Sequence, residues 1–310
     1  MTHISVLLNE AVDGLNIKPD GIYVDLTLGG GGHSKEILKR LTTGSLLCVD
    51  RDQFAIDKAT EVLKDFDNKT IIKNSFDQID EILKQLNIKK VDGFLLDLGV
   101  SSFQFDDGER GFSYNKDYKL DMRMDRDAEL SAYEVVNKYA ENDLYRIFRD
   151  YGEEKFAKNI AKHIVIERQK KNIETTFELV EIIKQSIPSK LRQNEKHPAK
   201  RVFQALRIFV NDELTQLDNT LDKIIDLLND KGRISIITFH SLEDRLVKNK
   251  YKTFEDPCIC PKGYPCVCGK KPKGIIITKK AIVPTEEEIN INRRSKSSKL
   301  RIFERRYDNG

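Results

Sequence analysis

The first hundred residues alternate short, continuously apolar runs with segments whose apolar residues recur at helical spacing. The apolar runs predict strands at Gly21–Asp25, Ser45–Asp50, Thr70–Asn74 and Val91–Asp97. The segments between them predict helices at Ser34–Leu41, Gln53–Leu63 and Phe76–Leu86. Continuously apolar strands between amphipathic helices are typical of a parallel sheet that is covered on both faces. The pattern therefore predicts an α/β fold with a doubly wound, mainly parallel sheet.

This alternation stops after Asp97. Residues Phe105–Asp127 have the composition of a loop, and from Ser131 to about Asn229 the apolar spacing is helical throughout. Strand-like runs return at Gly232–Phe239, Gly274–Thr278 and Leu300–Phe303. We therefore expect a helical domain, residues 106–212, inserted into a Rossmann-like domain made of residues 1–105 and 213–310.

Two sequence signals describe the helical part more closely. Thr175 and Glu178 have the spacing of a capping box, which predicts a helix from there to about Ser186. A further segment begins at His197–Pro198 and keeps its helical spacing through Leu228, which predicts one long helix.

Four consecutive glycines, Gly29–Gly32, follow the first strand and precede a helix. Glycine has no Cβ to block a close ligand, and a helix start offers unpaired N–H groups. The plainer alternative for the glycines alone is a flexible turn. Ser34 stands where the dinucleotide fingerprint has its third glycine, so a pyrophosphate site is poorly supported.

Three side chains follow strands at the edge where such sheets bind ligands. Asp50, after the second strand, is suited to accept hydrogen bonds from both hydroxyls of a ribose. Phe76 could lie against an adenine, and Asp97 could meet an amino group. A nucleoside without phosphate but with a cationic amino-acid arm matches S-adenosylmethionine. Singly, each residue has a plainer interpretation: a cap for Asp50 and Asp97, and core for Phe76.

Composition narrows the cellular context. A chain of 310 residues, 39% of them hydrophobic, is long enough for two domains, and no run of about 18 apolar residues is present to span a membrane. The first ten residues lack the basic and apolar regions of a signal peptide. We expect a cytoplasmic protein without membrane contact.

The net charge of +3 conceals an asymmetry. Residues 245–310 hold 17 Lys and Arg against 7 Asp and Glu, a net charge of +10, which leaves −7 for residues 1–244. A basic segment on an acidic body indicates a polyanionic partner, with nucleic acid first among them. The alternative is a solvated, partly disordered tail.

Four of the five cysteines form a C-x-C-x5-C-x-C cluster, Cys258, Cys260, Cys266 and Cys268. Four thiolates this close could bind Zn²⁺ tetrahedrally. The C-x-C spacing is tight for two ligands of one ion, however, so free thiols remain the alternative. Cys48 lies inside a predicted strand and fits a core residue.

Several longer motifs occur in a fixed order, at residues 3–11, 30–34, 49–52, 96–102, 109–113, 120–124, 151–154, 197–199, 203–207 and 239–245. Together they resemble the MraW (RsmH) family of ribosomal RNA small-subunit methyltransferases. The resemblance covers nearly the whole chain. It implies the S-adenosylmethionine-dependent methyltransferase fold with an inserted helical domain for substrate recognition.

The resemblance also implies an activity, methylation of N4 of a cytosine in the decoding region of small-subunit (16S) rRNA. The family's cofactor-binding positions correspond to Gly31, Gly32, His33, Asp50, Phe76, Asp97 and Gln104 in this sequence. Two features depart from a minimal member, the cysteine cluster and Gly30, where some relatives carry another residue. Neither departure changes a residue at the cofactor-binding positions.

The chemistry can be considered from the residues as well. A cytosine N4 amine is a weak nucleophile, so the enzyme needs in-line alignment and a hydrogen-bond acceptor that draws electron density onto N4. Asp97 is the candidate catalytic residue for that role. No cysteine lies beside the site motifs, which disfavours the covalent route used for carbon-5 methylation.

The target base has to be unstacked, so single-stranded or flipped RNA is the expected substrate. Candidate RNA contacts are Arg293, Arg294, Lys296, Lys299, Arg301, Arg305 and Arg306, with Lys200, Arg201 and Arg207 on the predicted long helix. His197, His240 and Arg245 are expected near the cleft mouth. Arg301, between Leu300 and Ile302, could instead be on the wet face of a strand.

Two other functions stay open. One is a methyltransferase acting on another RNA or on a protein. The other is a non-catalytic ribosome-assembly factor that binds S-adenosylmethionine only as a ligand. The sequence leaves the oligomeric state undetermined.

Overall fold

The computed structural model describes residues 5–99, 110–191, 197–261, 263 and 265–307. The chain divides into two compact units, residues 1–99 with 214–310 and residues 100–213. We describe each unit by itself. The domain limits expected from the sequence, 106–212 for the insertion, stay a prediction.

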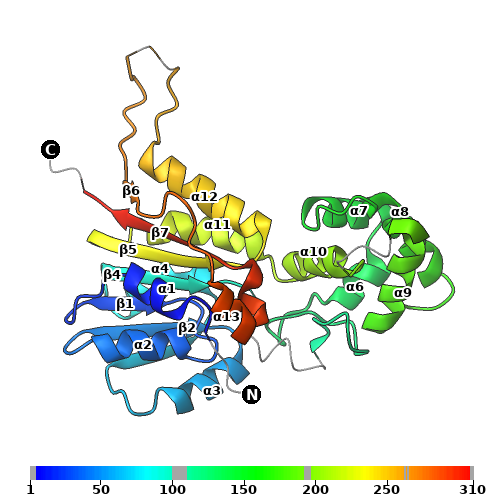
Figure 1. The fold of residues 1–310 in the computed structure, drawn as a ribbon, viewed down its shortest axis with the longest axis horizontal. Helices are drawn as coiled ribbons and strands as arrows, with labels where there is room; N and C mark the ends of the chain where they lie inside the picture. Colours follow the sequence, from blue (N-terminus) through cyan, green and yellow to red (C-terminus); the bar gives the residue numbers. More distant parts are fainter. Residues whose placement is uncertain (1–4, 100–109, 192–196, 262, 264, 308–310) are drawn as a thin grey trace. The chain divides into compact units, whose positions relative to one another are not determined.

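The first unit is built on one sheet of seven strands (Figure 1). Their order across the sheet is β3 (Lys69–Lys73), β2 (Ser45–Asp50), β1 (Ile22–Asp25), β4 (Val91–Asp97), β5 (Leu228–Thr238), β7 (Lys299–Arg305) and β6 (Gly274–Ile276). All neighbours are parallel except β7, which runs antiparallel to both β5 and β6. This confirms the expected doubly wound, mainly parallel sheet.

Helices cover both faces of this sheet. Because successive residues of each strand point to opposite sides, each strand contributes side chains to the core on both faces. Tyr23 and Leu95 pack with the helices of one face, α1 (Leu8–Gly14), α2 (Gly32–Arg40) and α3 (Gln53–Val62). Val24 and Phe94 pack with those of the other face, α4 (Ile79–Gln85), α11 (Glu213–Ile224) and α12 (Ser241–Glu255). The remaining short elements are η1 (Phe76–Gln78), α13 (Glu286–Ile291) and η4 (Arg293–Ser297).

The second unit has a hydrophobic core of its own. Its described helices are α6 (Ala132–Lys138), α7 (Glu141–Asp150), α8 (Ala157–Arg168), α9 (Thr176–Ser186), η3 (Ser189–Leu191) and α10 (Lys200–Val210). The predicted capping box is confirmed, since the Glu178 N–H donates to Thr175 Oγ1 at 3.3 Å and the Thr175 N–H donates to Glu178 Oε2 at 3.1 Å. The inserted helical region expected from the sequence is therefore present.

The long helix predicted from His197 to Leu228 is wrong. It is broken after Val210, and α11 begins at Glu213, because Asp212 has a left-handed φ of +47°. The Asn211 side chain leaves the helix direction to bind a distant loop: its Nδ2 donates to the Met122 carbonyl at 2.8 Å, and its Oδ1 accepts from the Met124 N–H at 2.7 Å. Apolar spacing continues across the break, so periodicity alone could not reveal it.

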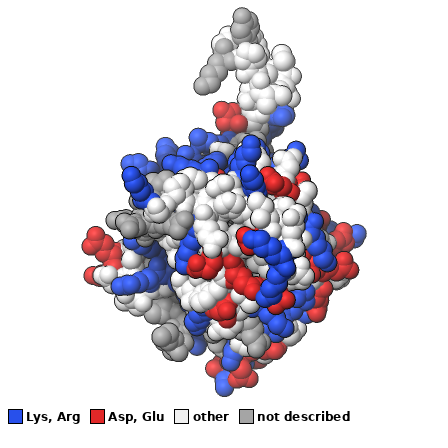
Figure 2. Space-filling view, turned by 90° about the vertical axis from the view of Figure 1, so that its right-hand side faces the viewer, with Lys and Arg blue, Asp and Glu red and all other residues white. Residues whose placement is uncertain are grey.

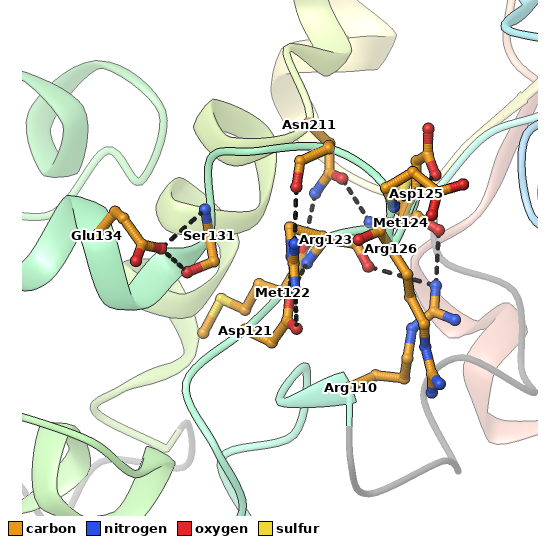
Figure 3. A network of polar contacts seen from close by, with 12 residues as sticks. Arg110, Asp121, Met122, Arg123, Met124, Asp125, Arg126, Ser131, Glu134 and Asn211 are labelled. Carbon is orange, nitrogen blue, oxygen red and sulfur yellow. Dashed lines mark hydrogen bonds and ion pairs between the residues drawn. The ribbon is translucent and has the colours of Figure 1, made fainter.

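The loop bound by Asn211, residues 110–131, is held by polar side chains (Figure 3). Arg110 Nη2 donates to the Met124 carbonyl at 2.6 Å, and Arg123 makes two parallel bonds to the Asp121 carboxylate at 2.7 and 2.9 Å. Such bidentate pairs fix the orientation of both groups. The loop is thus ordered by its own hydrogen bonds, with little regular secondary structure.

The basic C-terminal fifth is folded, so the alternative of a disordered tail is wrong over its described residues. It forms much of α12 and all of β6 and β7, and acidic side chains pair with its charges. Asp244 accepts from Arg301 Nε at 2.6 Å and from Lys299 Nζ at 2.9 Å. Arg301 is 8% exposed, which rules out the wet face of a strand. Within the described part of the chain, no helix is both long and apolar enough for a membrane span.

Candidate active site at the carboxyl edge of the sheet

The glycine turn, residues 26–31, leads from β1 into α2 along the edge where the parallel strands end. Gly29 and Gly31 have φ values of +49° and +78°, the left-handed region that favours glycine. At Gly32 a Cβ would come within 2.0 Å of Ser5 Oγ. Gly31 is also the N-cap residue, and it has no side chain with which to cap the first N–H groups of α2.

Asp50 ties this turn to the end of β2. Its Oδ2 accepts from the Gly29 N–H at 2.8 Å, and its Oδ1 accepts from the Asp52 N–H at 2.9 Å. Burial raises the pKa of this carboxyl above its usual value. Each carboxylate oxygen has a second lone pair, so Asp50 can still accept hydrogen bonds from a ligand's hydroxyl groups.

Asp97 lies at the end of β4, across the switch point where the strand order reverses. Its backbone N–H donates to Thr27 Oγ1 at 2.5 Å, which ties β4 to the glycine turn. Its Oδ1 is buried and has no hydrogen-bond partner among the described residues, while about a fifth of the whole side chain, 21%, is exposed. Burial, together with the charges of Asp25 and Glu243, raises the pKa of Asp97 well above its usual value.

His33 stands beside Asp97 in the first turn of α2. Its Nε2 lies 3.0 Å from the Val6 carbonyl, which can only accept, so Nε2 carries a proton. In the neutral ring Nδ1 is then the unprotonated nitrogen, and it lies 3.7 Å from Asp97 Oδ2. That distance exceeds an ordinary hydrogen bond and leaves Asp97 without a strong neutralising partner.

Asp25 is a buried carboxyl at this edge that the sequence reasoning missed. It is 1% exposed, its Oδ2 accepts from Ser34 Oγ at 2.6 Å, and its Oδ1 accepts from the Thr27 N–H at 3.1 Å. Burial raises the pKa of Asp25 to about 6. The signal was available, because Asp25 ends its strand as Asp50 and Asp97 end theirs.

These carboxyls make the edge selective for positive charge. Asp25 raises the pKa of Asp97, and Asp50 raises the pKa of Asp25, because ionised neighbours disfavour each other in a buried setting. A cationic ligand would reverse this cost by favouring the ionised forms. The edge therefore fits a ligand that carries positive charge as well as hydroxyl groups.

The other predicted cofactor residues are placed as follows. Phe76 begins η1 just after β3, half-buried against the core beside the strand that carries Asp50. Gly31, Gly32, His33, Asp50 and Asp97 share the carboxyl edge, as the contacts above describe. Gln104 lies outside the described residues.

Two of the expected cleft residues have structural contacts. His240 caps α12: its Nδ1 accepts from the Glu243 N–H at 3.3 Å, while the Phe239 N–H donates to Glu243 Oε2 at 2.8 Å. In the second unit His197 stacks on Tyr114 with ring centroids 4.5 Å apart, and burial lowers its pKa. Arg245 is exposed on α12.

The sheet register separates the candidate RNA contacts. Lys299, the first residue of β7, pairs with Thr238 at the carboxyl end of β5, so the exposed residues of η4 just before it belong to the candidate site's edge. These are Arg293, Arg294 and Lys296. Arg305 pairs with Gly274 at the opposite edge. In the second unit Lys200 and Arg201 are exposed, whereas Arg207 is bound to the Glu213 carboxylate by two bonds of 2.9 Å.

The four clustered cysteines are also brought together. They lie in the hairpin that joins α12 to β6, and their sulfur atoms all lie within 4.8 Å of one another. All four are free thiols, and so is Cys48, which is buried in β2 as expected.

Known proteins match the chain along nearly its full length. A model of the MraW methylase family matches residues 1–306. Curated relatives include ribosomal RNA small subunit methyltransferase H of Lachnospira eligens, 60% identical over 306 residues, which are 98% of this chain and 97% of the relative. The same-named protein of Clostridium botulinum strain Loch Maree is 59% identical over 302 residues, 97% of each chain.

A third relative, ribosomal RNA small subunit methyltransferase H 2 of Agathobacter rectalis, is 58% identical over 307 residues and 98% of both chains. Matches at this identity and coverage extend through both units. The seven-stranded, doubly wound sheet is accordingly the S-adenosylmethionine-dependent methyltransferase fold, and the chain belongs to the MraW methylase family.

Proposed function

We propose that this protein transfers a methyl group from S-adenosylmethionine to N4 of a cytosine in small-subunit (16S) rRNA, near the decoding centre. The observation that carries the proposal is Asp97 Oδ1, a buried oxygen beside the glycine turn with no hydrogen-bond partner among the described residues, in a member of this family. A cytoplasmic location goes with the proposal, because that is where small subunits are assembled.

Side-chain chemistry supports the cofactor. Asp50 would accept hydrogen bonds from the ribose hydroxyls, and Phe76 would lie against the adenine. The N-terminus of α2, with Gly31 as its N-cap and Gly32 and His33 in its first turn, would hold the carboxylate of the amino-acid arm. Asp97 would meet positive charge, and Gln104 belongs to the set by its family position. The two positive centres of the cofactor suit an edge whose carboxyls raise one another's pKa.

The same residues suit methyl transfer. Bound S-adenosylmethionine supplies a methyl group already activated by its sulfonium. N4 forms a bond to that methyl as the sulfur–carbon bond breaks, and N4 then loses one of its protons. An ionised Asp97 would accept a hydrogen bond from the N4 amine and draw electron density onto the nitrogen. Its raised pKa also suits it to take up the released proton, because a base works best when its pKa lies near the working pH.

RNA binding would use the basic turn at the same edge, together with the inserted helical domain, 106–212, as the substrate-recognition part. Figure 2 shows basic and acidic side chains intermixed over one face of the molecule, with no single basic patch there. At the edge of the candidate site, η4 offers the exposed cations Arg293 and Lys296 for RNA recognition.

Reversing the charge of Arg293 and Lys296 to Glu is expected to weaken RNA binding and to lower the slope of log affinity against log salt by about two. The control is the double reversal of Lys248 and Lys252, which are exposed on α12 and change the net charge equally. Equal losses in both variants would show that net charge, rather than the η4 site, governs binding.

The direct test of the function is transfer of a radiolabelled methyl group. Assembled small subunits, naked 16S rRNA and free proteins are offered as acceptors, and labelled RNA is digested to nucleosides. We expect label in N4-methylcytidine from the small subunit, and labelling that is slower by about 10²- to 10³-fold with Asp97→Ala. Label in protein or in another RNA would contradict the proposal and would show that the protein is a methyltransferase acting on another target. Tight cofactor binding without any transfer would favour an assembly factor.

The cofactor of methyl transfer is S-adenosylmethionine alone in this proposal. A zinc ion at Cys258, Cys260, Cys266 and Cys268 has no part in the reaction, because the cysteine hairpin leaves the sheet at the edge opposite Asp97.

A further inference from the structure

The cysteine hairpin, residues 256–273, projects from the first unit between α12 and β6 (Figures 1 and 2). It rejoins the sheet at Gly274, which pairs with Arg305, while the neighbouring Glu304 pairs with Arg233 near the start of β5. The hairpin therefore belongs to the edge where the parallel strands begin. Its chemistry can be considered independently of methyl transfer.

Apolar packing does not explain how this hairpin is held. Its two aliphatic side chains, Ile259 and Val267, are 72% and 88% exposed. An ion pair between Lys273 Nζ and Asp226 Oδ2, 2.8 Å long, lies at the base of the hairpin, one residue before β6. Beyond this base, its four cysteines are in contact with one another through sulfur.

The sulfur atoms form a compact group with regular spacing. Cys266 Sγ lies 3.6 Å from Cys258 Sγ, 4.0 Å from Cys260 Sγ and 3.5 Å from Cys268 Sγ, and Cys268 Sγ lies 4.0 Å from Cys258 Sγ. Four thiolates at about 2.3 Å from one Zn²⁺ form a tetrahedron whose edges are about 3.8 Å. A disulfide needs about 2.05 Å. The observed spacings match the edges of a zinc–thiolate tetrahedron and are too long for disulfides.

Backbone N–H groups point at the same sulfurs. The Val267 N–H donates to Cys260 Sγ at 3.4 Å. Backbone N–H groups of Ile259 and Lys270 bond to the Cys268 sulfur. Hydrogen bonds of this kind stabilise the thiolate, which is the form that binds a metal. A second shell that orients and charges the ligands is typical of metal sites.

We propose that Cys258, Cys260, Cys266 and Cys268 bind one Zn²⁺ ion in a closed, structural site that fixes the hairpin. All four coordination positions are protein sulfurs, which leaves none for water or substrate. The ion enters as thiol protons leave, at most four for each Zn²⁺, and its oxidation state does not change. The proposal does not depend on the proposed methyl transfer.

Metal content provides the first test. The full chain is produced with added zinc, purified under reducing conditions without chelator, and assayed for metal. We expect about one zinc per chain, and loss of at least nine-tenths of it in Cys266→Ser, whose sulfur touches the other three. Cys48→Ala is the matched control, because burial raises the pKa of Cys48 to about 12 and keeps that thiol from binding metal.

A second measurement uses wild-type protein, so that the test does not depend on a variant that folds poorly. Wild-type protein is stripped with a chelator and loaded with Co²⁺, and the expected result is the absorption of tetrahedral cobalt–thiolate, with proteolysis of the hairpin faster in the stripped form. S-adenosylmethionine binding should stay within twofold throughout. Metal-free wild-type protein with four freely titrating surface thiols, or zinc retained by Cys266→Ser and Cys258→Ser alike, would overturn the site. Neither result would bear on methyl transfer.

Discussion

The loop 110–131 and the glycine turn both contain sequence motifs and lack regular secondary structure. They differ in whether the polar groups in and beside them have hydrogen-bond partners. The loop 110–131 includes Met122 at a left-handed φ of +61°, and the glycine turn has Gly29 and Gly31 in that region. In the loop, Asn211 and the arginines bind carbonyls and carboxylates of the loop itself (Figure 3). At the turn, Asp97 keeps one buried oxygen without a partner.

The difference separates a structural role from a functional one. A buried polar network whose members bind one another contributes stability, whereas a buried polar atom without a partner costs free energy. The contacts that Asn211 and Arg123 make in the loop are therefore explained by folding. At the turn, Asp97 Oδ1 has no partner among the described residues, and a cationic cofactor would supply one.

The comparison is tested most severely by Asp97→Ala. We expect the single-turnover methylation rate to fall by about 10²- to 10³-fold, the scale seen when one preorganised electrostatic contact is removed. Because the wild-type carboxyl is buried at a cost, the unfolding free energy without cofactor should not fall. Normal turnover with cofactor bound would remove Asp97 from catalysis.

Asn211→Ala should show the opposite behaviour. Leaving the Met122 carbonyl and the Met124 N–H without partners should destabilise the second unit by about 3 kcal/mol. Hydrogen exchange of residues 110–131 would report this as faster exchange, with S-adenosylmethionine affinity unchanged. Asp212→Asn, at an exposed left-handed position that Asn also tolerates, is the control. A large loss of cofactor affinity would mean that the loop is not purely structural.

Asp25 predicts a pH dependence of stability. Its pKa is about 6 in the folded protein and about 3.8 when exposed, so between those values the folded form binds more protons than the unfolded form. Stability of the cofactor-free protein should therefore fall as pH rises from about 4 to about 6, by about 2 kcal/mol from this group. Denaturation at several pH values measures the slope, and Asp25→Asn should flatten it. If the pH dependence of stability were unchanged in Asp25→Asn, other titratable groups would be its cause.

The smallest expected effect is that of Asp50→Ala. Losing the acceptor for the ribose hydroxyls should weaken S-adenosylmethionine binding about tenfold, equivalent to one or two hydrogen bonds. The rate at saturating cofactor should stay near wild type, in contrast to Asp97→Ala. Calorimetry measures the affinity, with the exposed Asp57→Ala on α3 as control. A loss of rate without a loss of affinity in Asp50→Ala would assign Asp50 to catalysis instead of cofactor binding.

The sequence was most informative where local pattern and topology agree. Strands Ser45–Asp50 and Val91–Asp97 appear with the predicted limits, because buried parallel strands are continuous apolar runs. The break at Asn211 depends on bonds to residues almost ninety positions away, which no local pattern contains. Asp212, whose residue type tolerates a left-handed φ, was the one local sign.

The candidate site could be predicted only in part for a similar reason. Residue type and position at a strand end identified Asp50 and Asp97, yet the unpartnered oxygen of Asp97 depends on packing among several elements. The prediction of a solvent-exposed Arg301 was wrong. Alternating polar and apolar residues indicate a solvent-exposed face only where one face of the strand is open to solvent. β7 is an interior strand, and Asp244 of α12 meets this arginine. The roles of the named cofactor residues stay predictions until the variants are measured.

The neighbour relation of β4 and β5 has a consequence for biosynthesis. These adjacent strands are separated by 130 residues of chain, from the end of β4 at Asp97 to the start of β5 at Leu228. At a translation rate of roughly 5–20 residues per second, β5 arrives about ten seconds after β4. Until then the half-sheet β3-β2-β1-β4 has β4 as an open edge strand, the kind of surface that recruits unwanted strand partners. The nascent chain therefore passes through an interval in which early folding of the helical unit, or cover by a chaperone, would decide how much of it is recovered as native protein.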